Sequence, residues 1–137
     1  MTTVPRAATV ASIAIVGAAI AAGLFVTGSP SEQRLLRLDE QRVTDLRQLS
    51  YAANNRWDRQ QQLPSSAADL VDGQYLSRLP VDPVSGQPYE YRATGSQEFE
   101  VCATFDRPSR PALAGDFWFH ESGRRCFAFD VNEPSGR

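Results

Sequence analysis

Twenty consecutive residues near the start of the chain, Ala7 to Val26, include no charged side chain, no amide side chain and no proline. At about 1.5 Å of rise per residue, a helix of this length spans the hydrocarbon core of a bilayer, which is about 30 Å thick. The run therefore predicts a transmembrane helix. About 110 residues follow it, which is the size of one small domain with a single hydrophobic core.

A secretory signal peptide is the alternative interpretation of this run, because it too has a short leader followed by apolar residues. Arg6 and the small-x-small sequence Ala19-Ile20-Ala21 fit that alternative. The apolar part of a signal peptide is usually about 7 to 15 residues long, which favours an uncleaved anchor here. The expected parts are a leader (1–6), a transmembrane helix (7–26), a linker with a long amphipathic helix (27–62), a loop-and-sheet domain (63–131) and a polar tail (132–137).

Small residues recur on one face of the predicted anchor: Ala14, Gly17, Ala18, Ala21 and Ala22. This spacing lets two helix backbones approach closely in lipid, so the face is a candidate for packing against a partner helix. Chance is the alternative, because alanine makes up much of the run.

A long amphipathic helix is expected over residues 30 to 61. Ser29-Pro30-Ser31-Glu32 is a helix-start pattern, and Leu63 before Pro64 closes the helix. Its apolar positions follow helical spacing at Val43, Leu46, Leu49 or Ser50, Ala53 and Trp57. Trp57 is expected to be a core residue or an interface anchor.

Arginines alternate with acids along this helix, at Arg34, Arg37, Arg42 and Arg47. Contact with lipid headgroups is one interpretation, and an ordinary solvated helix face is the preferred one. The formal net charge of -2 and the pI of about 5.4 provide no basic field, which argues against nucleic acid as a partner. All 14 basic residues are arginine, which we interpret as compositional bias.

Beyond the long helix, Ser65 or Ser66 begins a short helix that ends by Gly73, and then the periodicity becomes that of strands. Strands are expected at 88–92 and 98–105, followed by a strand pair at 117–120 and 126–131. The apolar faces of the second and last strands are Phe99, Val101, Ala103 and Phe105, and Phe127, Phe129 and Val131. The prediction is an α+β fold in which the long amphipathic helix packs on a small antiparallel sheet.

The two cysteines, Cys102 and Cys126, both fall on the less apolar faces of their predicted strands. In a chain with an apolar N-terminal segment they suggest one disulfide outside the cytoplasm, and two buried free thiols are the alternative. The arginines after the anchor would place the domain inside, but long domains often disregard that count. The cysteine pair and the type of domain favour the outside, so the C-terminal domain is expected to be periplasmic or extracellular.

The order of these parts resembles the pseudopilins of type II secretion systems, especially the major pseudopilin. Three segments carry the resemblance, which extends over about residues 30 to 105: Leu63-Pro64-Ser65-Ser66, Tyr75 to Pro80, and Asp82-Pro83-Val84-Ser85-Gly86-Gln87-Pro88-Tyr89-Glu90-Tyr91. The resemblance implies a pilin-like fold and a single-pass protein of the bacterial cytoplasmic membrane. In that family a glycine before the cleavage site is followed by a glutamate five residues later, whereas here no acid occurs between Met1 and Ser31. The calcium site of the major pseudopilin is not carried over to Asp106 and Asp116.

We expect no catalytic residue, cofactor or metal. His120 is the only histidine and has no evident catalytic partner, so a structural role is expected, and Asp82 before Pro83 is expected to form a turn. The leading hypothesis is a non-enzymatic accessory or assembly subunit of a larger membrane complex of the secretion, transport, respiratory or photosynthetic kind. It would contact its partners and the bilayer through the transmembrane helix and the long helix. The alternatives are a minor pseudopilin of a secretion or pilus machine, and a small ligand-binding or enzymatic domain.

Overall fold

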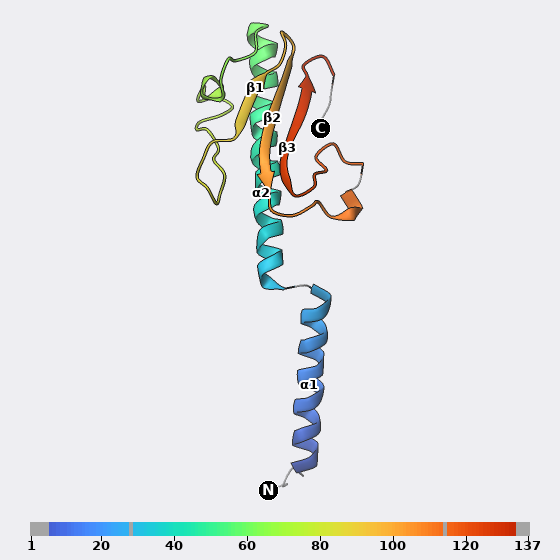
Figure 1. Ribbon diagram of the computed structural model, residues 1–137. Coiled ribbons are helices and arrows are strands. Elements are labelled where there is room, and N and C mark those ends of the chain that lie inside the picture. Colours follow the sequence, from blue (N-terminus) through green and yellow to red (C-terminus); the bar gives the residue numbers. More distant parts are fainter. Residues whose placement is uncertain (1–5, 28, 114, 134–137) are drawn as a thin grey trace. The chain divides into compact units, whose positions relative to one another are not determined.

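The computed structural model describes residues 6–27, 29–113 and 115–133 and divides into two units, 1–34 and 35–137 (Figure 1). Residues 1–5 of the predicted leader, Gly28 of the linker and 134–137 of the polar tail lie outside the described residues.

Helix α1 (Arg6–Thr27) contains the apolar run. Over an 18-residue window its mean hydropathy is 2.3, and none of that window is buried. Its large side chains, such as Ile13, Ile20 and Phe25, are exposed. By length and composition this helix is able to cross a membrane. That it does so stays a prediction from the apolar run.

Helix α2 (Pro30–Gln60) begins where the helix-start pattern predicted, with the Glu32 N–H donating to Ser29 Oγ at 3.3 Å. The predicted stripe is the buried one. Leu46, Leu49, Ser50 and Ala53 are buried, with Val43 and Trp57 partly buried beside them. The prediction of a long amphipathic helix is therefore confirmed.

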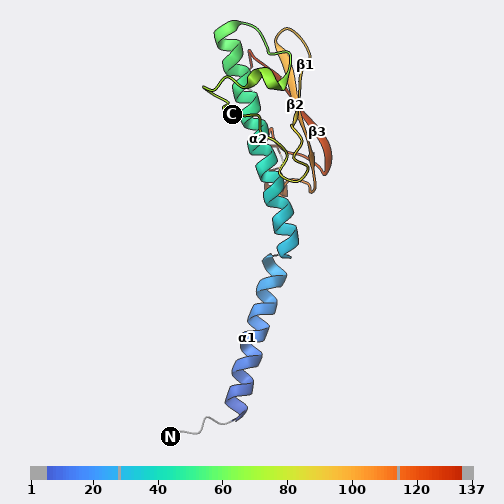
Figure 2. The same cartoon turned by 90° about the vertical axis from the view of Figure 1, so that its left-hand side faces the viewer.

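Three antiparallel strands form one sheet in the order β1-β2-β3: β1 (Glu90–Ala93), β2 (Glu98–Phe105) and β3 (Gly123–Asp130). One face of this sheet lies against α2 (Figures 1 and 2). On that face Phe99 pairs with Phe129 and Val101 with Phe127, and the rings of Phe99 and Phe129 stack at 5.0 Å. The structure is thus α+β, with its core between helix and sheet, as the alternation of apolar residues predicted.

The predicted strand at 117–120 is wrong. The Asp116 carboxylate accepts the Trp118 N–H at 2.7 Å, and the Asp116 carbonyl accepts the Phe119 N–H at 3.0 Å, so this segment turns instead of extending. Trp118 still enters the core, where its ring lies 4.8 Å from that of Phe127. The strand predicted at 126–131 therefore has no partner at 117–120. It pairs with β2 instead, and it begins at Gly123 and not at Cys126.

Between α2 and β1 the chain is held by turns. The predicted short helix is a four-residue 3-10 helix, η1 (Ala67–Leu70), whose Asp69 carboxylate accepts the Ser66 N–H at 3.1 Å. Leu63, Leu70 and Leu76 bury their side chains in the core. Farther along, Val81 and Pro88 form an isolated antiparallel bridge that closes the turn containing Asp82.

Candidate functional site

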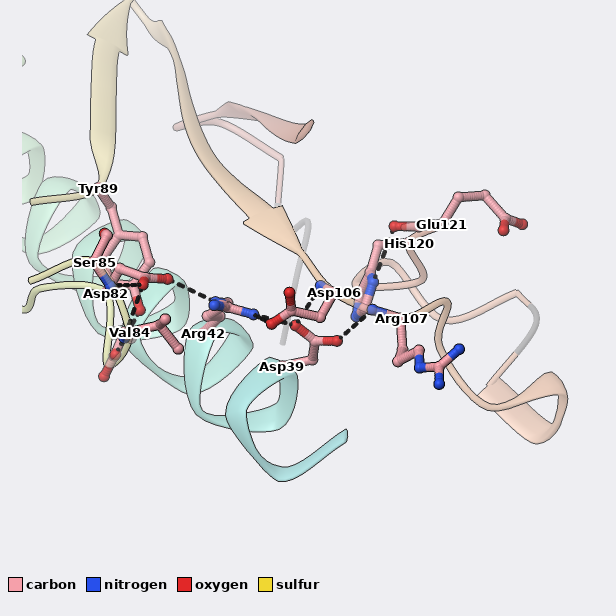
Figure 3. Close-up of polar contacts among 11 residues, drawn as sticks. Asp39, Arg42, Asp82, Val84, Ser85, Tyr89, Asp106, Arg107, His120 and Glu121 are labelled. Atoms are coloured by element: carbon pink, nitrogen blue, oxygen red, sulfur yellow. Dashed lines mark hydrogen bonds and ion pairs between the residues drawn. The ribbon is translucent and has the colours of Figure 1, made fainter. Parts of the chain in front are cut away.

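A buried arginine at the centre of three carboxylates is the main polar cluster of the domain (Figure 3). Arg42 of α2 donates from Nε to Asp82 at 2.6 Å, and from Nη1 to Asp39 and to Asp106, each at 2.6 Å. Its side chain is 5% exposed. We call Arg42 with Asp39, Asp82 and Asp106 the Arg42 cluster.

Two of these carboxylates also hold backbone N–H groups. Asp39 accepts from the N–H of Asp106 at 3.0 Å and of Arg107 at 2.8 Å, while Asp82 accepts from Val84 at 2.9 Å and from Ser85 at 2.8 Å. The cluster therefore ties the turn after residue 81 and the end of β2 to one turn of α2. Asp82 forms a turn, as predicted from Asp before Pro.

Electrostatics favours the charged form of every group whose pKa is shifted in this cluster. Burial by itself raises the pKa of Asp82, but hydrogen bonds from Arg42 and from the N–H groups of Ser85 and Val84 outweigh it and lower the pKa to about 2. Burial would also lower the pKa of Arg42, and its carboxylate partners reverse that effect and raise it. A group held this firmly in one protonation state is suited to holding a structure together and not to proton transfer.

The prediction of a solvated face for the four helix arginines is wrong for Arg42. Arg34, Arg37 and Arg47 are exposed, whereas Arg42 lies on the buried side of α2. A signal was present in the sequence, since the spacing of the apolar stripe continues backwards from Val43 and Leu46 to Asp39 and Arg42. Charged residues within an apolar stripe indicate a buried ion pair.

Asp45 lies on α2 one helical turn after Arg42 and accepts a hydrogen bond from the Tyr89 hydroxyl at 2.9 Å. Burial raises the pKa of Asp45, an effect that this hydrogen bond only partly offsets. Burial and the Asp45 carboxylate raise the pKa of Tyr89. The pair anchors the start of β1 to α2.

The ring of His120 stacks on that of Phe105 at 3.6 Å, and its Nδ1 lies 3.4 Å from the Glu121 carbonyl oxygen. Burial lowers its pKa. Its main chain exchanges hydrogen bonds with Ser109, whose Oγ accepts the His120 N–H at 3.0 Å. These contacts agree with a structural role.

A groove of about 290 Å³ lies between α2 and residues 108–120. Its apolar walls include Leu36, Val43 and Trp118, and its polar walls include Glu40 and Arg110, which form an ion pair at 3.6 Å. The volume is that of one large side chain or a small ligand. Asp116 also lines this groove and accepts the Trp118 N–H, whereas Asp106 bonds to Arg42.

On the other face of the sheet, the sulfur atoms of Cys102 and Cys126 lie 2.13 Å apart, at disulfide-bonding distance. The two residues are direct cross-strand partners in β2 and β3, on the face where the strand alternation placed them. Among the described residues, the group of acids, cysteines and histidines close enough to share a metal ion is this pair with Glu100. The two sulfurs are bonded to each other as a disulfide, so they are not thiolates that could bind a metal ion.

The predicted helix-packing residues Ala14, Gly17, Ala18, Ala21 and Ala22 all lie within α1 and are exposed. A Cβ atom added at Gly17 would meet no heavy atom within 4 Å. The backbone on this face is therefore open to close approach by another helix.

No family model matches the chain, no curated protein matches it, and no solved structure matches it. The pseudopilin resemblance remains a prediction from the motifs of residues 63 to 91.

Proposed function

We propose that this chain is a non-enzymatic, single-pass membrane protein whose C-terminal domain lies outside the cytoplasm and which serves as an accessory or assembly subunit of a larger membrane complex. The observation that carries the proposal is α1, an apolar helix with no buried residue in its most apolar window. Exposing such a surface to water costs about 25 cal/mol per Å² of apolar area. Lipid and partner helices remove that cost.

The open backbone at Gly17, flanked by Ala14, Ala18 and Ala21, supports a helix partner in addition to lipid. Small residues at such spacing allow the van der Waals contact that drives helix association where no hydrophobic effect operates between helices.

The polar groups of the C-terminal domain support a non-enzymatic role. Each carboxylate of the Arg42 cluster accepts a hydrogen bond from the same guanidinium, and His120 is stacked on Phe105. A catalytic acid or base instead needs a partner and a pKa poised near the working pH.

The test uses the full chain, extracted from the membranes of its own cells in mild detergent. We expect the wild type to resist alkaline carbonate washing and to co-purify with a membrane protein. Gly17→Leu, which fills the small-residue face, should stay in the membrane but lose that partner, whereas Val16→Leu, on the opposite side of α1, should keep it. Release by carbonate, or a monomer with no companion, contradicts the proposal.

A minor pseudopilin of a secretion or pilus machine is the second candidate. The packing of α2 on a small antiparallel sheet, preceded by the turn that Asp82 and Pro83 form, favours it. Mass spectrometry of the mature N-terminus distinguishes the two, because a pseudopilin is cleaved and methylated. A chain that is intact or has lost only Met1 rejects this candidate.

A further inference from the structure

The face of the sheet opposite α2 carries the cysteine pair between two ion pairs. Arg124 of β3 holds Glu90 of β1 at 3.0 and 2.7 Å, and Arg92 of β1 holds Glu100 of β2 at 3.0 Å. The two cysteines differ in burial: Cys102 is 3% exposed, whereas Cys126 is only partly buried. The two ends of the disulfide are therefore not equivalent.

The guanidinium of Arg124 also reaches the buried sulfur, with Nη2 lying 3.5 Å from Cys102 Sγ. An adjacent arginine stabilises a thiolate over a thiol. Glu100 opposes this effect, because its carboxylate lies within 4.8 Å of both sulfurs, but its charge is balanced by Arg92. The Arg124 guanidinium contacts both Glu90 and the Cys102 sulfur. The two arginines and two glutamates around the disulfide together carry no net charge.

We propose that this disulfide is a site of thiol–disulfide exchange with a dithiol, in which Cys126 is attacked and Cys102 leaves. Cys126 is the less buried of the two residues, so we take its sulfur as the electrophile, and the Cys102 sulfur beside Arg124 as the better leaving group. The chemical class of partner is a protein or small molecule with two neighbouring thiols.

The exchange balances in two steps. A thiolate of the dithiol forms a bond to Cys126 Sγ, the Cys102–Cys126 bond breaks, and its electron pair leaves on Cys102 Sγ as a thiolate beside Arg124. The second thiol of the dithiol, as its thiolate, then bonds to the dithiol sulfur of the mixed disulfide. The bond from that sulfur to Cys126 Sγ breaks, and Cys126 leaves as a thiolate. The dithiol is oxidised to a disulfide, and the cysteine pair gains its two electrons and two protons.

The sheet has other means of staying folded when the bond is broken. Strands β2 and β3 are paired from Glu98↔Asp130 to Phe105↔Gly123, and their opposite face is packed through Phe99 and Phe129. Reduction therefore leaves two thiols within a folded domain instead of opening the domain.

The first experiment measures the rate of reduction of the full chain in detergent. Samples are exposed to dithiothreitol, quenched by alkylation at intervals and counted for free thiols. Arg124→Gln should be reduced several-fold more slowly than wild type, and Arg124→Lys should recover part of the rate. Arg125→Gln is the matched control, because Arg125 lies on the other face with its guanidinium 5.8 Å from the Phe127 ring centre. In urea all four proteins should react at the same rate.

The second experiment identifies the attacked sulfur. Brief exposure to glutathione, acid quenching and peptide mapping should find the mixed disulfide at Cys126 and the alkylated thiol at Cys102. An adduct at Cys102, equal adducts at both sulfurs, or equal reduction rates for wild type and Arg124→Gln overturns the proposal. Two thiols that label in unreduced, denatured protein also overturn it. None of these outcomes depends on membrane attachment or on a helix partner.

Discussion

Replacing Arg42 by methionine is the most direct test of how the domain is held together. Methionine matches arginine in helix propensity and keeps an unbranched side chain, so the change removes the guanidinium without weakening α2 by itself. It leaves Asp39 and Asp82, whose side chains are 4% and 15% exposed, without their cation. Breaking a buried ion pair from one side typically costs about 3–5 kcal/mol.

The structure places the expected loss near the lower end of that range. Asp39 and Asp82 each keep two backbone N–H donors, and Asp106 is 42% exposed and regains water. For Asp82, the fall in pKa from 3.8 to about 2 corresponds to roughly 2 kcal/mol of stability at neutral pH, part of which comes from Ser85 and Val84. We therefore expect Arg42→Met to lower the free energy of unfolding by about 3 kcal/mol, a large share of the roughly 5–15 kcal/mol of an ordinary domain.

Urea unfolding of the full chain in detergent, followed by tryptophan fluorescence, measures this loss. Arg37→Met, at an exposed arginine of the same helix, is the control and should change stability by no more than about 0.5 kcal/mol. In wild type, Asp82 contributes stability above about pH 3.8 that is lost as the pH falls towards 2. The difference between wild type and Arg42→Met should therefore shrink over that interval. A loss below about 1 kcal/mol, or a loss independent of pH, would refute the reasoning.

Two further outcomes follow from the core. Phe99→Ala, at a side chain with no exposure between sheet and helix, should cost about 3–5 kcal/mol in the same assay, whereas Val84→Ala, at an exposed side chain, should cost about 0.5 kcal/mol or less; similar losses would place the core elsewhere. Because burial lowers the pKa of His120 from 6.5, the folded state binds fewer protons than the unfolded state below that pH, and the stability from neutral His120 is lost as the pH falls through its folded pKa. The pH slope of stability just below 6.5 should be flatter in His120→Gln, and an unchanged slope would contradict the burial argument; Asp45, whose raised pKa acts in the opposite sense, is present in both proteins and cancels in the comparison.

Features that depend on local periodicity could be predicted from the sequence. The apolar stripe of α2 follows a spacing of three and four residues, and the apolar faces of β2 and β3 follow alternation, so Leu46, Phe99 and Phe129 were assigned to the core correctly. The faces of Cys102 and Cys126 followed from the same alternation. The strand pairing that sets them opposite each other needs the register.

Features that depend on distant residues could not be predicted. Arg42 meets Asp82 and Asp106 across 40 and 64 residues of sequence, and nothing local distinguishes it from the exposed Arg37 except its place in the apolar stripe. The error at residues 117–120 has a different cause. Three consecutive aromatic residues, Phe117, Trp118 and Phe119, are typical of a strand. Asp116 instead supplies the hydrogen bonds of a turn, and the turn still places Trp118 in the core.

The absence of lysine from the chain has two meanings at different positions. At exposed sites such as Arg37, compositional bias is a sufficient explanation, and Arg37→Lys should leave stability within about 0.5 kcal/mol of wild type. At Arg42, two separate nitrogens address carboxylates from three segments of the chain, and a single ammonium cannot reproduce that fork.

Arg42→Lys should therefore lose at least one charge-assisted hydrogen bond, about 1.5–3 kcal/mol, while keeping the cluster's cation and so remaining more stable than Arg42→Met. Urea unfolding of Arg42→Lys beside Arg37→Lys measures the difference. If the two lysine variants prove equally stable, the carboxylates need only a positive charge, and the geometry of the guanidinium contributes nothing to holding the loops on α2.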